Sequence, residues 1–180
     1  MVYYQSVMLM PREFPKRKTL RLRQFDYNTP RAYFITLCTH NKRNILGHVV
    51  GALHEAPEIQ LTDYGFIVDA IIRATPARFN ITIDRYVIMP NHVHLIVTVN
   101  PNFSPRAIRE SPLQRSVISK TIGYIKMNAS KKIHEHSGES AVWQRGFHDH
   151  IIRDERDYLK IAKYIEENPT RWQLDCFYTK

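Results

Sequence analysis

The chain has 180 residues, a length that suits one folded domain with its own core. It contains no run of about 18 apolar residues, which excludes a transmembrane helix, and its start, an apolar patch before basic residues, has the wrong order for a secretory signal. The 26 Lys and Arg residues outnumber the 17 Asp and Glu residues, and the formal net charge of +9 favours a polyanionic partner such as nucleic acid. Two cysteines, Cys38 and Cys176, lie in no metal or disulfide spacing, so we expect a cytoplasmic protein.

Two parts of the chain differ in composition. Residues 1–30 are rich in basic residues and proline, with Lys16, Arg17 and Lys18 in succession, and are predicted to form a basic N-terminal arm. Such an arm could follow a phosphate backbone, although an ordinary solvated tail has the same composition. Residues 31–180 are expected to form a single domain.

The first half of this domain alternates strand and helix. Ala32–Thr39 is rich in β-branched and aromatic residues and predicts a strand, followed by a polar, irregular connection over residues 40–60. Thr62 can cap a helix over residues 63–73, in which apolar residues recur at helical spacing. Two further strands, residues 79–90 and 92–99, are joined by a tight turn at Pro90 and Asn91, which predicts antiparallel pairing.

The second half adds two helices around one strand. Ser111, Pro112 and Gln114 form a capping-box pattern, so we expect a helix from this point through an isoleucine stripe to Ile133. Residues 147–153 indicate a short strand, and Asp154 begins a last helix that Pro169 ends. Antiparallel strands with helices packed on them predict an α+β fold.

Six of the nine histidines form three His-x-His pairs. On a strand, residues two apart share a face, so His92 and His94 project together as a bidentate half-site for a metal. His134 and His136 fall at a helix end and are expected to be solvated, whereas His148 and His150 are intermediate because their segment could be a strand. Any such pair can also be two unrelated histidines.

Tyrosines on the helices are the next candidates. Tyr164 and Asn168 lie four residues apart on one face of the last helix, and Asp157 falls on the same side. Tyr164 is expected at the rim of the buried stripe, where its hydroxyl can face the sheet, although an ordinary packed tyrosine fits the same pattern. Tyr124 lies away from the isoleucine stripe of its helix, and Tyr158 lies in the apolar face of the last helix, so both are weaker candidates.

Three blocks in this order, "MPNHVHLI", "AVWQRGFHDHIIRDERDY" and "YIEENP", resemble the single-tyrosine transposases of the HUH endonuclease superfamily, named for a His-hydrophobic-His motif. The chain most resembles the REP-associated tyrosine transposases and the insertion-sequence transposases from which they derive, over Ala32 to Pro169. The resemblance implies a ferredoxin-like antiparallel sheet packed with helices. It also implies metal-dependent nicking and strand transfer of single-stranded DNA through a covalent 5′-phosphotyrosine.

Residue roles follow from the same resemblance. It implies that His92 and His94 bind the metal, that Tyr164 is the nucleophile and that Asn168 completes the metal shell. Mg²⁺ or Mn²⁺ is the expected ion, while the imidazole pair would also suit zinc. The expected DNA contacts are Lys126, His150 and Arg153 in the domain and Lys16, Arg17 and Lys18 in the arm.

The expected partner is single-stranded DNA with hairpin-forming repeat ends, and no membrane. Phe25, Tyr27 and Trp143 are candidates to stack on bases, and each could equally be a core or tail residue. A homodimer is possible, because insertion-sequence relatives exchange the tyrosine helix between two copies. Two alternatives stay open: a catalytically silent DNA- or RNA-binding regulator on the same scaffold, and an unrelated metal-dependent phosphoesterase in which Tyr164 is structural.

Overall fold

A four-stranded antiparallel sheet with the strand order β4-β5-β1-β6 forms the centre of the protein. The computed structural model describes residues 26–51, 57–101 and 116–178. The four strands are β1 (Ala32–Cys38), β4 (Ile81–Ile88), β5 (His92–Val99) and β6 (His148–Ile151). A separate two-stranded sheet pairs β2 (Gly47–Val50) with β3 (Glu58–Leu61).

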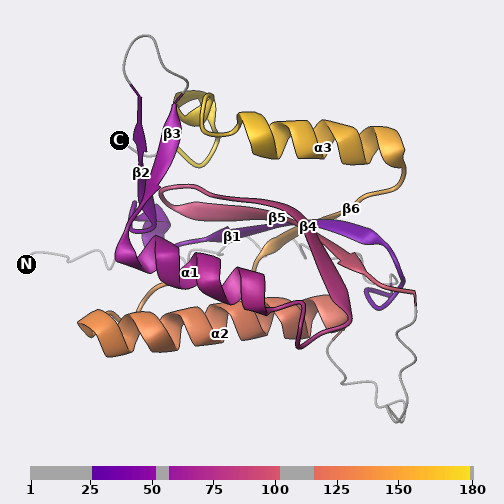
Figure 1. The fold of residues 1–180 in the computed structure, drawn as a ribbon, viewed down its shortest axis with the longest axis horizontal. Helices are drawn as coiled ribbons and strands as arrows, with labels where there is room; N and C mark the ends of the chain where they lie inside the picture. The colour runs from indigo at the N-terminus through magenta and orange to yellow at the C-terminus, as the bar shows by residue number, and fades with distance from the viewer. Residues whose placement is uncertain (1–25, 52–56, 102–115, 179–180) are drawn as a thin grey trace, which may run out of the picture.

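Three helices cover the two faces of the sheet (Figure 1). These helices are α1 (Asp63–Ala74), α2 (Val117–Ser137) and α3 (Glu155–Glu167). Helices α1 and α2 lie side by side on one face, whereas α3 covers the other, where it contacts β4 and β5. The chain order β1-α1-β4-β5-α2-β6, with this strand order, is the split βαβ arrangement of ferredoxin-like folds. The predicted α+β, ferredoxin-like fold is therefore confirmed.

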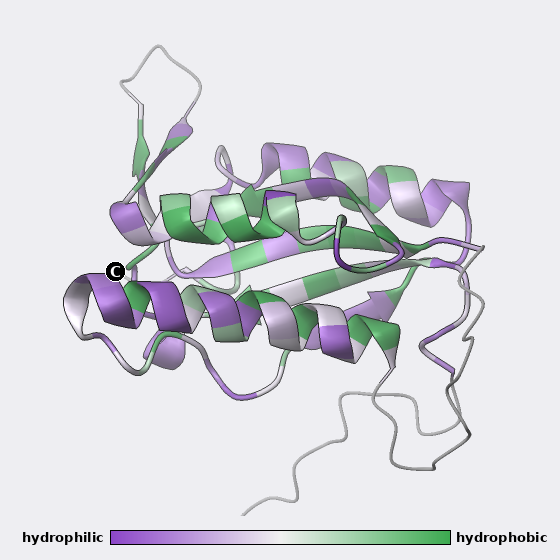
Figure 2. Ribbon diagram, turned by 60° about the horizontal axis from the view of Figure 1, so that its bottom comes forward, coloured by the Kyte–Doolittle hydropathy of each residue, from purple (hydrophilic) through white to green (hydrophobic). Residues whose placement is uncertain are grey.

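The two faces of β5 differ in chemistry because successive side chains on a strand point to opposite sides. Val93, Leu95 and Val97 face α1 and α2 and are fully buried in the larger apolar cluster. His92, His94 and Ile96 face α3, where a smaller cluster of Ile96, Ile152, Ala162 and Ile165 leaves room for polar groups. Figure 2 shows hydrophobic residues along the central strands and mixed hydropathy along the helices. The fold thus places its stabilising core on one face and its histidines on the other.

Helix starts follow the local sequence at two of the three helices. The hydroxyl of Thr62 accepts from the amide of Gly65 at 3.2 Å, and the carboxylate of Asp154 accepts from the amide of Asp157 at 2.8 Å. Helix α3 ends at Glu167, with Asn168 as its C-cap and Pro169 beyond it. These predicted boundaries are confirmed.

The structure corrects two predictions, the residue at which α2 starts and the irregular connection over residues 40–60. Helix α2 begins at Val117, because Ser116 has non-helical backbone angles (φ −56°, ψ 159°) and its hydroxyl caps the amide of Ser119. The expected capping box at residues 111–114 lies outside the described residues. Within residues 40–60 the structure has β2 and β3, whose four-residue strands carry too few alternating apolar residues to give a clear strand signal.

The first described residues belong to the packed domain. Tyr27 is buried and stacks on Tyr33 with ring centroids 5.8 Å apart, and the side-chain oxygen of Asn28 accepts from the amide of Val117 at 2.9 Å. Of the two interpretations left open for Tyr27, the structure supports the core residue and not the base-stacking residue. Phe25 and the basic residues Lys16, Arg17 and Lys18 lie outside the described residues. Among the described residues, none of the helices has the length and apolar character that crossing a membrane requires.

Candidate metal and nucleophile site

Two buried imidazoles form the centre of the site. His92 and His94 are 0% and 1% exposed, and their ring centroids lie 4.4 Å apart. Both rings lie on the α3 side of β5, a central strand that is paired on both sides, by β4 and β1. The register sets Thr36 opposite His94 and Cys38 opposite His92. The His-x-His pair is thus held rigidly by a strand that cannot shift without breaking two ladders.

The tautomer of His92 is fixed by its neighbour. The amide nitrogen of Asn91 donates to the carbonyls of Lys42 (3.2 Å) and Phe177 (2.9 Å), so its Oδ1 is the atom that faces His92 Nδ1 at 2.9 Å. Because an amide oxygen only accepts, Nδ1 carries the proton and Nε2 has a lone pair. That Nε2 is buried and has no hydrogen-bond partner. A buried, unpaired acceptor of this kind is what a metal ligand presents.

His94 has an adaptable partner. The hydroxyl of Thr36 lies 2.9 Å from His94 Nδ1, and it can donate to that nitrogen or accept from it. When the hydroxyl accepts from Nδ1, that nitrogen carries the proton, so the Nε2 of His94 is unprotonated and can bind a metal. Phe34, the β1 residue two before Thr36, packs against the His94 ring at 5.0 Å and keeps it in place.

The phenol of Tyr164 reaches this pair within the same chain. Its oxygen lies 3.2 Å from His94 Nε2 and donates to the carboxylate of Asp175 at 2.9 Å. Its side chain is 37% exposed, so the nucleophile candidate stands between the buried histidines and solvent. Asn168, one helical turn on, is buried; its Nδ2 donates to Asp175 at 3.0 Å, while its Oδ1 has no partner.

Asp175 completes a group that could hold a metal ion. One ligand atom from each of His92, His94 and Asp175 lies within 4.8 Å of the others. Two imidazoles and a carboxylate suit a divalent transition ion, whereas Mg²⁺ prefers oxygen ligands, and the orphaned Nε2 of His92 is consistent with a bound metal ion. Sequence reasoning missed Asp175, which follows the last helix in the short segment "QLDCFY" and carries no periodic or motif signal.

Burial tunes the protonation of these groups. It lowers the pKa of His92 to about 4 and lowers that of His94 well below its usual range. Both rings are therefore neutral near pH 7, the form that binds metals. Burial and then the charge of Asp175 raise the pKa of the Tyr164 phenol. Burial alone would raise the pKa of Asp175, but hydrogen bonds from the amide of Phe177 and from Asn168 lower it, so it stays ionised.

The C-terminal segment covers the site. Phe177 and Trp172 pack on the His92 ring at centroid distances of 4.7 and 5.9 Å. Lys42 lies 5.4 Å above the Phe177 ring and donates to the carbonyl of Cys176 at 3.3 Å. Asn41 and Lys42 both have positive φ (54° and 52°), a costly conformation for such residues that occurs preferentially at functional sites.

The other histidine pairs lie outside this group of ligand atoms, although the His148 ring is 6.5 Å from that of Phe177, which covers the site. His148 and His150 are both exposed on β6, at the sheet edge, and His150 Nε2 pairs with the Asp157 carboxylate at 2.9 Å. His134 and His136 are exposed in the last turn of α2, and the expectation that they are solvated is confirmed.

The remaining candidates are distributed over the domain. Lys126 Nζ donates to the carbonyls of Gln144 and Gly146 at 2.5 and 2.7 Å, so it holds the loop before β6. Arg153 is exposed between β6 and α3. Trp143 is half-buried and forms an isolated antiparallel β-bridge with Thr39.

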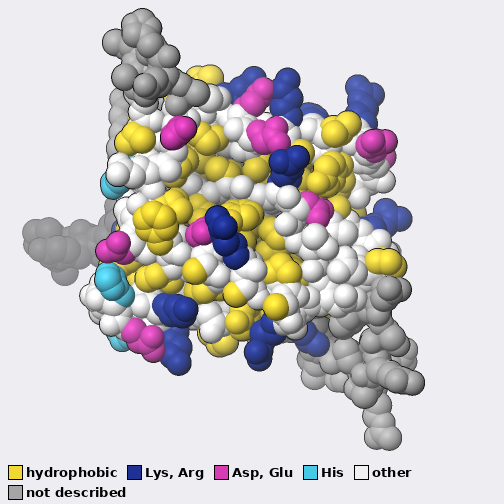
Figure 3. All heavy atoms as spheres, in the orientation of Figure 1, with side chains coloured by type: hydrophobic (Ala, Val, Ile, Leu, Met, Phe, Trp, Pro, Cys, Tyr) yellow, Lys and Arg dark blue, Asp and Glu magenta, His cyan; other side chains and the backbone are white. Residues whose placement is uncertain are grey.

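The competing tyrosines pack elsewhere. Tyr124 packs against Phe79 at 5.5 Å, on the α1 and α2 side of the sheet. Tyr158 packs against the smaller apolar cluster beneath α3. Figure 3 shows that on one face of the molecule Lys and Arg side chains are scattered among acidic and apolar ones rather than gathered in a single patch.

Comparison with known proteins defines the class of this chain. The family described as "Transposase IS200 like" matches residues 31–168, which include both site histidines, Tyr164 and Asn168. The chain therefore belongs to the IS200-like transposase family.

Individual proteins are similar to this chain in sequence or in fold. The chain is 35% identical over 172 residues to an uncharacterized protein of Haemophilus influenzae, covering 90% of this chain and 93% of that one. It is 28% identical over 122 residues to a second protein of that organism, named "Putative REP-associated tyrosine transposase", covering 66% of each. The fold is similar to that of a REP-associated tyrosine transposase solved bound to a REP hairpin, with a TM-score of 0.58 and 22% identity, covering 84% of this chain and 73% of that chain.

Proposed function

We propose that this protein nicks single-stranded DNA and transfers the cut strand, with Tyr164 as nucleophile. The observation that carries the proposal is the 3.2 Å contact between the Tyr164 hydroxyl and Nε2 of buried His94. Every group of the candidate centre comes from one chain, so a tyrosine helix exchanged between two copies is not needed to complete it. Membership of the IS200-like transposase family supports the same activity.

The metal would be held by the Nε2 atoms of His92 and His94. The Asp175 carboxylate or the unpartnered Oδ1 of Asn168 would supply a further oxygen ligand. Of the two ions expected, Mn²⁺ suits this mixed nitrogen and oxygen set better, whereas Mg²⁺ would depend on the oxygen ligands and on the phosphate. When bound, the ion would act as a Lewis acid on the scissile phosphate.

Tyr164 forms one bond as another breaks. Its phenol oxygen attacks phosphorus, the bond from phosphorus to the 3′-oxygen breaks, and the products are a 5′-phosphotyrosine and a 3′-hydroxyl that gains a proton. The phenol proton leaves toward the Asp175 carboxylate, which already accepts its hydrogen bond at 2.9 Å. Because the covalent ester keeps the bond energy, the 3′-hydroxyl of another strand can reverse the step without ATP.

Contacts to the DNA backbone are proposed from charge. Lys42 lies beside the site, and His150 on β6 and Arg153 after it line a pocket with the first turns of α3. The arm of residues 1–30 would add Lys16, Arg17 and Lys18. The net charge of +9 supports a polyanionic partner. A hairpin with single-stranded flanks is the proposed substrate, because a flexible strand can bend into a site partly covered by the C-terminal segment.

The test is a nicking assay with Mg²⁺ or Mn²⁺ on labelled single-stranded hairpins whose flanks carry randomised tetranucleotides. The wild-type protein should form a covalent protein–DNA adduct, and Tyr164→Phe should abolish it. Tyr158→Phe is the matched control, since Tyr158 lies on the same helix but packs against the apolar cluster. It should retain the adduct.

Other outcomes would identify the alternatives. Hairpin binding without an adduct, in every metal tried, would contradict the proposed chemistry and favour a DNA-binding regulator. Cleavage that is unchanged by Tyr164→Phe would favour a phosphoesterase in which this tyrosine is structural.

A further inference from the structure

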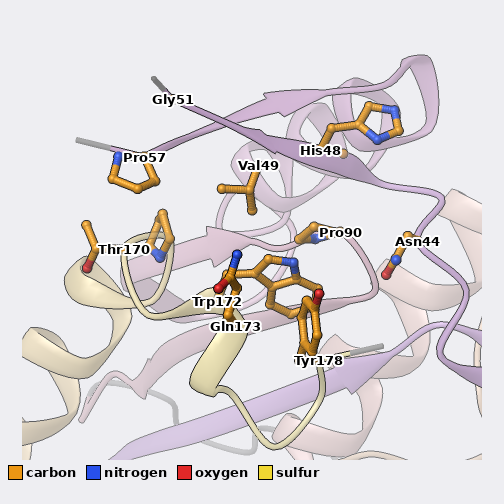
Figure 4. A pocket seen from close by; sticks show the side chains of 12 residues that line it. Asn44, His48, Val49, Gly51, Pro57, Pro90, Thr170, Trp172, Gln173 and Tyr178 are labelled. Atoms are coloured by element: carbon orange, nitrogen blue, oxygen red, sulfur yellow. The ribbon is translucent and has the colours of Figure 1, made fainter. Parts of the chain in front are cut away.

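A cavity of about 640 Å³ lies beside the metal and nucleophile site, between β2 and the segment that follows α3 (Figure 4). We propose that it holds an unpaired nucleobase of the DNA strand, next to the nucleotide that is cut. This inference rests on the proposed function and names a part of its substrate. It assigns a role to the two-stranded β2 and β3 unit, which the chemistry at Tyr164 does not use.

The position of the cavity links it to the cleavage site. Trp172 lines it and also packs against His92, with ring centroids 5.9 Å apart. Pro90 and Pro169, two further lining residues, lie two residues before His92 and one after Asn168. A strand with its phosphate at Tyr164 could therefore place an adjacent base in the cavity.

The chemistry of the walls selects a base over a phosphate. Among the described residues that line it there is no Lys, Arg, Asp or Glu, so these residues offer a phosphate no fixed counter-charge. Tyr178 supplies aromatic surface, on which bases of any sequence can stack, and Trp172, which is 8% exposed, packs edge-to-face against Tyr178 with ring centroids 5.3 Å apart. The side chains of Asn44 and Gln173 supply amide groups, which match the hydrogen-bonding edges of bases.

The same walls argue against a free nucleotide as the occupant. A free nucleotide carries its own phosphate and needs a cation beside its base site. In a strand, the phosphates can stay outside the cavity, near Lys42 and the metal site, while one base enters. The uncharged side chains that line the cavity therefore suit a base of a DNA strand whose phosphates are bound outside the cavity.

The two tryptophans of the chain allow a direct test. In Trp143→Phe, Trp172 is the single indole and reports on the cavity. Hexanucleotides dA6, dC6 and dT6 are titrated in EDTA, in a Tyr164→Phe background, so that no chemistry occurs. We expect quenching of the indole emission. An abasic hexamer with the same phosphates should bind about 5- to 150-fold more weakly, because one stacked base contributes about 1–3 kcal/mol.

Two variants control this result. Trp172→Phe, with Trp143 retained, should bind the hexanucleotides more weakly by anisotropy and show no quenching. Gln173 is exposed, so Gln173→Ala should fold normally and reduce the differences in affinity among the three hexanucleotides. Equal affinity for abasic and base-bearing hexamers, or binding without quenching of Trp172, would overturn the proposal. An adduct at Tyr164 without quenching would overturn the base site alone, whereas quenching without an adduct would overturn only the cleavage chemistry.

Discussion

His92 and His94 on β5 and His148 and His150 on β6 have the same spacing and belong to the same sheet, yet their surroundings differ. Strand β5 is central and paired on both sides, whereas β6 is an edge strand paired only with β1. The β5 pair is fully buried, with its ring nitrogens facing Asn91, Thr36 and Tyr164. The β6 pair is more exposed, and the described partner of His150 is the carboxylate of Asp157.

The difference teaches that position in the sheet, rather than the His-x-His spacing, prepares a metal site. Burial keeps the β5 imidazoles neutral, and a neighbouring amide fixes which nitrogen of His92 is free. An exposed imidazole beside a carboxylate is instead suited to a hydrogen-bonding or ion-pairing role.

The largest expected effect separates the two pairs by activity. His92→Ala or His94→Ala should lower metal-dependent nicking by at least about 1,000-fold, because loss of the bound ion removes several kcal/mol of transition-state stabilisation. The double change His148→Ala and His150→Ala should lower DNA affinity by less than about tenfold, because exposed side chains contribute about 1 kcal/mol to the binding free energy. It should leave the Mn²⁺ concentration for half-maximal nicking unchanged. A reversed order, with the β6 pair controlling the metal requirement, would refute the comparison.

A smaller effect is expected from the groups that orient the histidines. Asn91→Ala removes the acceptor that fixes the proton of His92 on Nδ1, so Mn²⁺ affinity should fall by about 10- to 100-fold. Asp157→Asn, which alters the partner of His150, is the matched control and should leave Mn²⁺ affinity unchanged. Isothermal titration calorimetry measures both, and melting curves in EDTA establish that each variant is folded. Equal affinities for Asn91→Ala and wild type would show that the amide does not prepare the site.

The smallest expected effect is on acid stability without metal. The pKa of His92 is about 4 in the folded protein and about 6.5 when unfolded, so protonation favours the unfolded chain as the pH falls below 6.5. The free energy of unfolding should drop by about 1–2 kcal/mol from this residue between pH 6.5 and 5. Urea unfolding in EDTA measures the change. His92→Gln should reduce this pH dependence to the part that comes from His94, whose pKa is also lowered, while His148→Gln should retain it; an equal slope in wild type and His92→Gln would contradict the assignment.

The sequence predicted those features of the fold and of the site that follow from the local periodicity of strands and helices. The alternation in "HVHLIVTV" predicted that His92 and His94 share a face, and the four-residue step from Tyr164 to Asn168 predicted a common helix side. The strands β2 and β3 were missed because each has only four residues. Asp175 was missed because its place beside Tyr164 arises from the return of the chain after α3, which no local pattern encodes.

The most direct measurement is anomalous diffraction from crystals of the protein grown with Mn²⁺. The account predicts one strong peak bonded to the Nε2 atoms of both His92 and His94, next to the Tyr164 hydroxyl, and its loss in His94→Ala crystals. A peak at His148 and His150 instead, or no peak between His92 and His94 in a protein that nicks DNA with Mn²⁺, would contradict the account.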